Sequence, residues 1–414
     1  MQAEILSIGD ELLIGQVVNT NAATIGQALT GVGIPVVHGS VIRDDLDDIV
    51  TGLKRAWQRS DIIVLTGGLG PTRDDKTVAA VAAFFDSPLV FSESTWSRLN
   101  TMFAQFGRTP TEAHRQQCML PADADLLTNR LGTAPGMHFS KDGRHLFVMP
   151  GVPYEMEGIL AEYVIPRIRN GLNGVVPVQV ATICTVGEGE SRLAEQIKDI
   201  EDGLPPGMQL AYLPRPGQVR VRITSRHKDH QEGIRQLHEV SDRIAARLAA
   251  FVYAREDIPL AEALGRQLAD RRLMLGVAES CTGGYLGHLI TSIPGSSAWF
   301  AGGGITYSNT LKMRLLGVAE ETLAQSGAVS EATVVEMARG AVQHFSADLA
   351  VAVTGIAGPD GGTPDKPVGT VWICVADANQ TLTRLFHFGK DRARNIELSA
   401  VSALNLVRKF LTRP

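Results

Sequence analysis

The segment Leu273–Gly284 constrains the fold of this chain more than any other stretch. Its first part, Leu273–Ala278, is an apolar run with the length and branched side chains of a buried strand. Glu-Ser-Cys-Thr-Gly-Gly then follows, and apolar residues return at helical spacing up to Pro294. The pattern predicts a parallel strand that turns into a helix at Ser280, where unpaired backbone N–H groups suit a phosphate or an oxyanion. Alternatively, Ser280 or Thr282 only caps that helix.

Composition favours a multidomain globular protein. The chain has 414 residues, 44% hydrophobic and 20% charged, so two or three domains are expected. A formal net charge of -5 argues against a general nucleic-acid binder. No apolar run is long enough to span a bilayer, Met1 leads directly into a strand-like segment, and the cysteines have neither disulfide nor metal spacing. We therefore expect a cytoplasmic protein with no signal peptide and no membrane contact.

Residues 1–170 alternate strand and helix patterns, which predicts a doubly wound α/β domain with a parallel sheet. Ligands of such folds bind beyond the carboxyl ends of the strands. Two of these strand ends have unusual sequence. A further strand-end loop, Met149–Pro153, is followed by Glu155, and we expect it to line the same cleft or to be only a rigid turn. The residues at the two ends are Gly9, Asp10 and Glu11, and then Gly67, Gly68, Gly70 and Thr72.

The loop from Thr66 to Asp75 is the main candidate binding element of this domain. A glycine-rich turn before a helix can cradle a phosphate. The adjacent Asp74 and Asp75 could hold Mg²⁺, which prefers carboxylate and phosphate oxygens. Alternatively, the two aspartates only complement the dipole of the following helix.

Residues 171–254 predict a small α+β module with a hairpin around Pro214–Gly217, where proline favours a loose turn. RNA binding is one interpretation of its basic edge. A solvated strand face is the other, because no aromatic stacking residues accompany the arginines. The arginines are Arg215, Arg220, Arg222 and Arg226.

Three strands of the last domain, residues 259–414, end in polar or glycine-rich sequence. The ends lie at Ser280, at Tyr307 with Lys312 after it, and at Thr354. A parallel sheet would gather them at one edge. No histidine lies in these motifs, so Lys312 is the candidate base for Ser280, with a pKa lowered by burial or by a neighbouring cation. Tyr307 could relay a proton, and backbone N–H groups near Ser280 and Thr354 could stabilise an oxyanion.

Other interpretations of this domain stay open at this point. Cys281 is a rival nucleophile or a small buried residue. Tyr307 could be a packing residue and Lys312 a surface lysine. Arg392 or Arg394, at the start of the last helix, could hold a substrate phosphate or be solvated.

These motifs resemble those of the CinA family, the competence/damage-inducible proteins. The C-terminal domain of that family is similar to nicotinamide-nucleotide amidohydrolase, also called nicotinamide mononucleotide deamidase. Full-length members combine an N-terminal molybdopterin-binding-like domain, a KH-like middle module and this C-terminal α/β amidohydrolase domain. The resemblance covers essentially the whole chain and rests on Ile8–Leu13, Gly67–Thr77, Met149–Met156, Ala278–Gly284, Gly303–Lys312, Val353–Pro359 and Val368–Val371.

The resemblance implies that the C-terminal domain hydrolyses nicotinamide mononucleotide to nicotinate mononucleotide and ammonia without a cofactor. Ser280 would be the nucleophile, Lys312 its base and Tyr307 a proton-handling or positioning partner. Family members usually have Gly-Asp-Arg before the last helix, whereas this chain has Gly-Lys-Asp-Arg, so either of two arginines could bind the phosphate. The implied substrate-binding residues are Thr282, Gly283, Gly284, Thr354, Gly355, and Arg392 or Arg394.

For the N-terminal domain the resemblance implies a nucleotide-like ligand, and in some members a metal-dependent ADP-ribose pyrophosphatase. A divalent ion on Asp74 and Asp75 could bridge the pyrophosphate and activate water. The resemblance also implies a homodimer. The competing hypotheses are a non-catalytic regulatory protein that binds a pterin or nucleotide in competence or DNA damage, a nucleic-acid-associated protein, and, for this domain, molybdopterin adenylyl transfer, because fold does not fix function.

Overall fold

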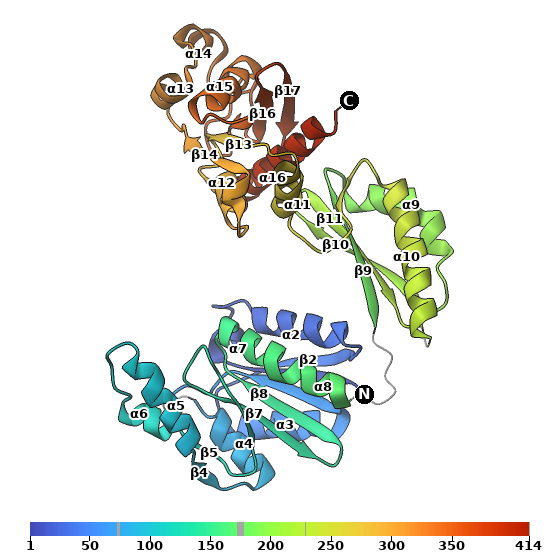
Figure 1. Ribbon diagram of the computed structural model, residues 1–414, viewed down its shortest axis with the longest axis vertical. Helices are drawn as coiled ribbons and strands as arrows, with labels where there is room; N and C mark the ends of the chain where they lie inside the picture. Colours follow the sequence, from blue (N-terminus) through green and yellow to red (C-terminus); the bar gives the residue numbers. More distant parts are fainter. Residues whose placement is uncertain (73–74, 172–177, 228, 414) are drawn as a thin grey trace. The chain divides into compact units, whose positions relative to one another are not determined.

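The computed structural model describes residues 1–72, 75–171, 178–227 and 229–413, and Asp74 lies outside the described residues. The chain forms two compact units (Figure 1). The first comprises Met1–Gln179 with Arg226–Gly233, and the second Val180–Ser225 with Ile234–Pro414. No helix of the described part of the chain has the length and apolar character needed to cross a membrane.

A mixed sheet with the strand order β2-β1-β3-β8-β7-β6 forms the centre of the first unit. The strands β2, β1, β3 and β8 are parallel to one another. The strands β7 and β6 are added at the β8 edge in antiparallel pairs. Alternate residues of β3 point into two different cores, so helices cover both faces as expected for a doubly wound fold. The strands are β1 (Ala3–Ile8), β2 (Val36–Ile42), β3 (Ile62–Thr66), β6 (Asp125–Leu127), β7 (Gly136–Lys141) and β8 (Arg144–Met149).

The antiparallel pair β7–β8 departs from the all-parallel sheet that the sequence pattern predicts. A two-residue turn joins the strands, and both of its residues, Asp142 (φ 53°) and Gly143 (φ 74°), have positive φ. Asp-Gly is the dipeptide that tight hairpins with two positive φ values prefer. The physical signal for this hairpin was therefore present in the sequence.

Helices α2, α7 and α8 contribute to one core of this unit, and α3 and α4 to the other. The strand β4 pairs with β5 away from the main sheet. The elements are α1 (Asp10–Leu13), α2 (Thr20–Gly31), α3 (Leu46–Arg59), α4 (Thr77–Phe85), β4 (Leu89–Phe91), α5 (Glu93–Ala104), α6 (Glu112–Gln116), β5 (Met119–Pro121), α7 (Pro153–Ile159), a π-helical turn (Leu160–Val164) and α8 (Ile165–Gly171).

The middle module has a four-stranded sheet of order β10-β11-β9-β12 beside α9 and α10. Its predicted hairpin is present, but the turn is tight. Arg215 pairs with Gln218, and only Pro216 and Gly217 (φ 70°) lie between them, which is the proline–glycine order of a type II turn. The elements are β9 (Gln179–Val186), α9 (Glu190–Asp202), β10 (Met208–Arg215), β11 (Gln218–Ser225), α10 (His230–Arg247) and β12 (Val252–Ala254).

The C-terminal sheet has the order β14-β13-β15-β16-β17. Strands β14, β13 and β15 are parallel, so their carboxyl ends meet at one edge, as the sequence predicts. Helices α11, α12 and α16 share a core with one face of this sheet, and α15 with the other. The elements are α11 (Leu260–Asp270), β13 (Leu275–Glu279), α12 (Tyr285–Thr291), a 3₁₀ turn (Ser296–Ala298), β14 (Phe300–Ile305), α13 (Asn309–Leu316), α14 (Glu320–Ser326), α15 (Glu331–His344), β15 (Leu349–Gly355), β16 (Thr370–Asp377), β17 (Thr381–His387) and α16 (Arg392–Leu411).

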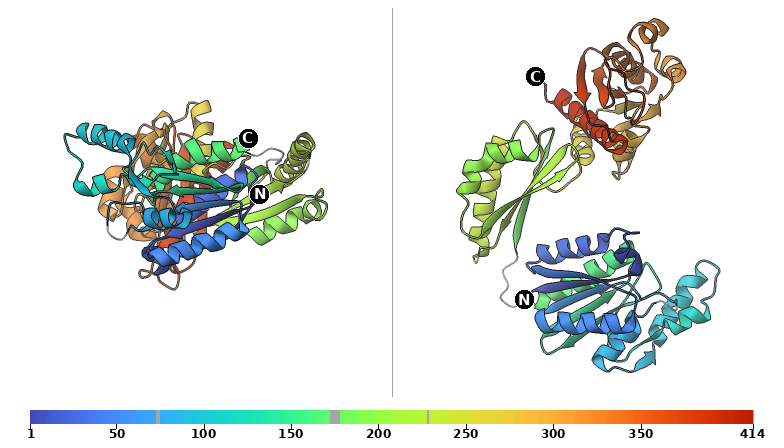
Figure 2. Two further views of the ribbon diagram at one scale, coloured as in Figure 1. Left: turned by 90° about the horizontal axis from the view of Figure 1, so that it is seen from below. Right: turned by 180° about the vertical axis from the view of Figure 1, so that it is seen from behind.

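The middle module and the C-terminal domain share a hydrophobic core. Cys184, Val186 and Tyr253 of the module belong to the same buried cluster as Leu264 and Leu404. Figures 1 and 2 show α11 and α16 where the two meet. The buried Arg408 of α16 strengthens the contact, because its guanidinium donates to the carbonyls of Ala250 at 2.9 Å and Val252 at 3.2 Å. The module is thus a fixed part of the second unit.

Candidate functional site

Ser280 lies where β13 ends, in a tight turn before α12. Its N–H donates to the carbonyl of Val353 on β15 at 3.1 Å. The turn ends at Gly283 (φ 61°) and Gly284 (φ 100°), whose left-handed conformations favour glycine. The predicted strand–turn–helix arrangement is therefore present, and the two glycines shape the turn rather than admit a ligand.

The N–H groups of Gly284, Leu286 and Gly287, at the start of α12, are already bonded and are closed to an anion. The carboxylate of Glu279 is almost fully buried and takes all three of them. Its Oε2 accepts from Gly284 N at 3.0 Å and Leu286 N at 3.1 Å, and its Oε1 from Gly287 N at 2.8 Å. The sequence pattern does not reveal that the last residue of β13 reaches forward over the turn and occupies these three N–H groups.

Lys312 is buried, with 1% of its surface exposed. Ser308 caps α13 by accepting from Leu311 N at 3.2 Å, and the helix carries Lys312 inward. Lys312 Nζ lies 3.1 Å from Ser280 Oγ and donates to the carbonyl of Thr306 at 2.8 Å. It forms no ion pair with a described residue, and burial lowers its pKa. The interpretation as a surface lysine is therefore wrong.

Tyr307 and Cys281 line the same pocket, which has a volume of about 280 Å³. Tyr307 is 61% exposed, so it is not a packing residue. Burial raises the pKa of the Cys281 thiol to about 12, which disfavours the thiolate that a cysteine nucleophile requires. Of the two adjacent candidates, the hydroxyl of Ser280 is the one that contacts the amine of Lys312.

The structure separates the two arginines at the start of α16. Arg392 lines the Ser280 pocket, where its Nη1 donates to the carbonyl of Gly358 at 2.7 Å and its Nη2 lies 3.5 Å from Tyr307 Oη. Arg394 lines a different cavity. The buried Asn395 fixes this helix end, because its Nδ2 donates to the carbonyls of Ala357 and Gly389 at 3.0 and 2.9 Å.

The remaining predicted residues of this domain support the pocket in different ways. Thr354 lines it, but its hydroxyl donates to the carbonyl of Ala328 at 2.8 Å and so positions a wall loop. Gly355 also lines it, and a Cβ there would meet Val371 Cγ2 at 2.6 Å, so glycine is required for strand packing. Thr282, Gly283 and Gly284 are not among the lining residues.

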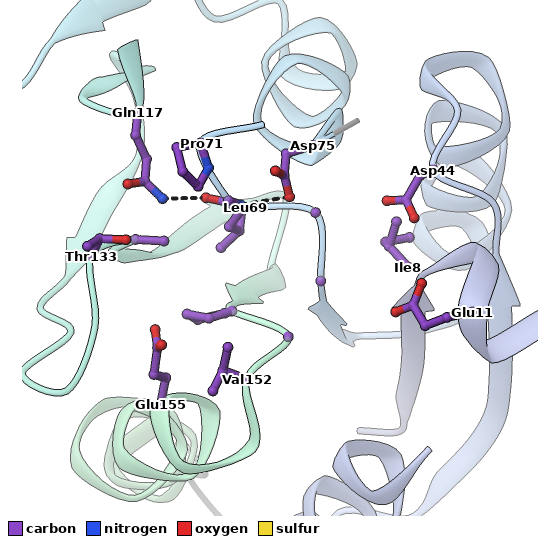
Figure 3. A pocket seen from close by; sticks show the side chains of 16 residues that line it. Ile8, Glu11, Asp44, Leu69, Pro71, Asp75, Gln117, Thr133, Val152 and Glu155 are labelled. Atoms are coloured by element: carbon purple, nitrogen blue, oxygen red, sulfur yellow. Dashed lines mark hydrogen bonds between the residues drawn. The ribbon is translucent and has the colours of Figure 1, made fainter. Parts of the chain in front are cut away.

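The N-terminal domain has a cavity of about 430 Å³ at the carboxyl ends of its parallel strands (Figure 3). The glycine loop forms one wall. A Cβ on Gly67 would meet the carbonyl oxygen of Ile8 at 2.3 Å, and one on Gly68 would meet Thr77 Oγ1 at 2.3 Å, so both positions need glycine. Gly70 also lines the cavity, whereas Gly9, Asp10 and Thr72 do not.

Asp75 holds the loop as well as lining the cavity. Its Oδ1 accepts from Gly70 N at 2.8 Å and its Oδ2 from Thr72 N at 2.9 Å. Figure 3 shows that Glu11 and Asp44 enter the cavity from one side and Glu155 from another. Burial and the charges of Glu11, Asp10 and Asp75 raise the pKa of Asp44. Asp44 is not among the residues predicted from the sequence, although it follows the end of β2 much as Glu11 follows the end of β1.

A divalent metal would have to rely on few protein ligands here. No described residues form a group of three or more His, Cys, Asp or Glu side chains that could hold an ion. Mg²⁺ often binds through one or two carboxylates and takes its other ligands from substrate phosphates and water. The carboxylates of the cavity fit that mode, and the role of Asp75 as a metal ligand stays a prediction.

Comparison with known proteins places three family models on the chain. They are described as "Probable molybdopterin binding domain" (residues 4–170), "Damage-inducible protein CinA KH domain" (181–254) and "CinA C-terminal domain" (257–411). A CinA-like protein of Cytophaga hutchinsonii is 39% identical over 99% of this chain and 98% of its own length. A CinA-like protein of Chloroherpeton thalassium is 42% identical over 99% of both chains.

Among solved structures, a competence/damage inducible protein of Agrobacterium tumefaciens is similar to part of this chain. It is 39% identical, with 38% of this chain and 98% of that chain covered and a TM-score of 0.36. The CinA superfamily protein of Escherichia coli is 34% identical, with 36% and 88% covered and a TM-score of 0.36.

Glu279→Gln should destabilise the second unit by about 2 kcal/mol, because an amide NH₂ would face one of the three N–H groups that the carboxylate now accepts. Urea unfolding followed by pulse proteolysis measures this. Glu331→Gln, at an exposed position in the first turn of α15, is the matched control and should leave the midpoint unchanged. Equal stability of the two variants would contradict the role assigned to Glu279.

Proposed function

This chain belongs to the CinA family, and we propose that its C-terminal domain hydrolyses the carboxamide of nicotinamide mononucleotide through Ser280. The contact of 3.1 Å between Lys312 Nζ and Ser280 Oγ, inside a pocket, is the observation that carries this proposal. The products are nicotinate mononucleotide and ammonia.

The proposed reaction begins when the neutral amine of Lys312 accepts the hydroxyl proton of Ser280. The lowered pKa of Lys312 makes this neutral form accessible. Ser280 Oγ then bonds to the carboxamide carbon and forms a tetrahedral oxyanion. As the C–N bond breaks, the lysine returns its proton to the leaving nitrogen and ammonia departs. Water, deprotonated by the same lysine, then hydrolyses the ester, releases the acid and restores Ser280.

Two groups of donors could stabilise the negative charges of this reaction. The backbone N–H groups of Cys281 and Thr282 follow the nucleophile directly, and neither donates to a backbone carbonyl of the described residues. These are the candidates for the oxyanion, a role that carries much of the rate in acyl transfer. Arg392, at the edge of the pocket beside Tyr307, is the candidate for the substrate phosphate.

The burial of Lys312 favours an enzyme over a non-catalytic binding protein. Placing an ammonium in the interior without a carboxylate partner is unfavourable, and such perturbed groups are concentrated at functional sites. A site that uses the neutral amine as a base accounts for this choice of residue.

Lys312→Met should reduce ammonia release from nicotinamide mononucleotide by at least about a hundredfold, since general-base catalysis contributes that much or more. The free energy of unfolding should fall by no more than about 2 kcal/mol, because a similar-sized apolar residue replaces a buried amine that has no carboxylate partner, and the main loss is the hydrogen bond to the Thr306 carbonyl. Ammonia assays and urea unfolding of the same preparations measure both. Cys281→Ala is the companion variant and should keep its activity. Full activity of Lys312→Met would exclude lysine as the base.

The pH profile of kcat/KM should rise with pH through the pKa of Lys312, because the neutral amine is the active base. Burial lowers that pKa, so the rise should occur at a lower pH than the titration of an ordinary lysine. Stopped assays of ammonia release across a pH series measure the profile. A rate that falls with rising pH over this range would mean that the charged ammonium is the active form.

For the N-terminal domain we propose metal-dependent hydrolysis of the ADP-ribose pyrophosphate. The supporting observation is the cavity that combines a glycine loop, suited to phosphate, with the carboxylates of Glu11, Asp44, Asp75 and Glu155. A bound Mg²⁺ or similar ion would supply charge neutralisation and an activated water there.

Asp44→Asn should lower Mg²⁺-dependent hydrolysis of ADP-ribose by at least about tenfold, because a carboxylate within the cavity is lost. Release of AMP, followed by chromatography, is the measurement. Asp47→Asn changes an exposed carboxylate in the nearby first turn of α3 and should have no effect. Ammonia release should be unchanged in both variants, and its loss in Asp44→Asn would contradict the assignment of the two reactions to separate sites.

A further inference from the structure

A second cleft of the second unit lies between the middle module and α16. It has a volume of about 600 Å³, in the range of small-molecule sites, and shares no lining residue with the Ser280 pocket. Its walls are the turn Gly187–Glu190, the tight turn of the β10–β11 hairpin, the end of β17 and one face of α16.

The walls of this cleft are held by close packing. Gly187 N donates to the carbonyl of Gly217 at 3.0 Å, which joins the two turns of the module. A Cβ on Gly187 would meet Asn405 Nδ2 at 2.6 Å, and one on Gly217 would meet Val401 Cγ1 at 3.1 Å. Both turns therefore approach α16 as closely as a backbone allows, and the cleft has a fixed shape before any ligand arrives.

Two unpaired arginines give the cleft an affinity for anions. Arg215 of the hairpin and Arg394 of α16 are exposed, and neither guanidinium forms a hydrogen bond or ion pair with a described residue. Arginine binds phosphate through two parallel N–H donors. Of the two acidic residues nearby, Glu188 is engaged by Gly189 N at 2.9 Å and by Arg192. The exposed carboxylate of Glu190 accepts no hydrogen bond from a described residue and can accept from hydroxyl groups.

Two phenylalanines supply a flat apolar surface in the same cleft. Phe386 and Phe388 lie on the same side of the chain where β17 ends, with ring centroids 5.5 Å apart and planes inclined by 18°. Both rings are half-buried, so part of each remains accessible. Stacking of a base on an aromatic ring is worth a substantial part of the affinity of nucleotide sites.

We propose that this cleft binds a mononucleotide, with the base against Phe386 and Phe388 and the phosphate on Arg394 and Arg215. Ribose hydroxyls would donate to Glu190. The site is distinct from the proposed active site, because Arg392, from the same turn of α16, contacts Gly358 and Tyr307 instead. The proposal does not depend on the amidase reaction.

The test is hydrogen exchange of the full-length protein with and without AMP, which has no carboxamide for Ser280 to attack. AMP should slow exchange of the backbone amides of residues 187–190 and 217–219, which line this cleft and line neither the Ser280 pocket nor the N-terminal cavity. The local readout separates this site from binding in the N-terminal cavity. No AMP-dependent change in these amides at saturating probe would overturn the proposal.

In Arg394→Gln, at least about ten times more AMP should be needed to give the same protection of these amides. A hydrogen bond to a charged group is worth that much affinity or more. The variant should fold normally, because the side chain is exposed and unpaired. Arg392→Gln, on the same helix turn, should leave the protection of residues 187–190 unchanged. Equal loss in both variants, or none in Arg394→Gln, would mean that AMP is not held by this cleft.

Discussion

Glu279 holds together the segments on which the C-terminal pocket depends, through its buried carboxylate and its main-chain carbonyl. Its side chain bonds the first N–H groups of α12, and its main-chain carbonyl accepts from Thr306 N at 2.7 Å at the end of β14. The turn with Ser280 and the segment leading to Lys312 are thereby fixed against one another. Since an oxyanion site needs donors in fixed positions, this anchoring is a condition for the proposed chemistry.

In the proposed reaction, the burial of Lys312 costs stability but makes its neutral amine accessible. In water its amine would be almost fully protonated at neutral pH and could not act as a base. In the pocket, burial lowers the pKa, while the carbonyls of Thr306 and Tyr307 and the hydroxyl of Ser280 still give Nζ polar neighbours. The lysine is therefore directed at one oxygen without a carboxylate that would hold the proton on it.

Helix α16 contacts both the Ser280 pocket and the middle module. The separate sequence motifs do not predict that these parts are neighbours. Its first turn presents Arg392 to the Ser280 pocket and Arg394 to the cleft against the middle module. Further along, Arg408 is buried against β12 and its preceding turn. The middle module thus packs against α16 and helps to hold the helix in place. The module therefore has a structural role apart from any contact with nucleic acid.

Periodicity and strand-end composition determined much of this protein from the sequence alone: the α/β architecture, the edge at which Ser280, Tyr307, Lys312 and Thr354 gather, and the glycine loop of the N-terminal domain. Such patterns work because burial and backbone conformation act locally. The tertiary structure alone decided which arginine lines the pocket, that Glu279 occupies the N–H groups at α12, and that Asp44 enters the N-terminal cavity. These outcomes depend on where a long side chain ends in space, which is set by segments distant in the sequence.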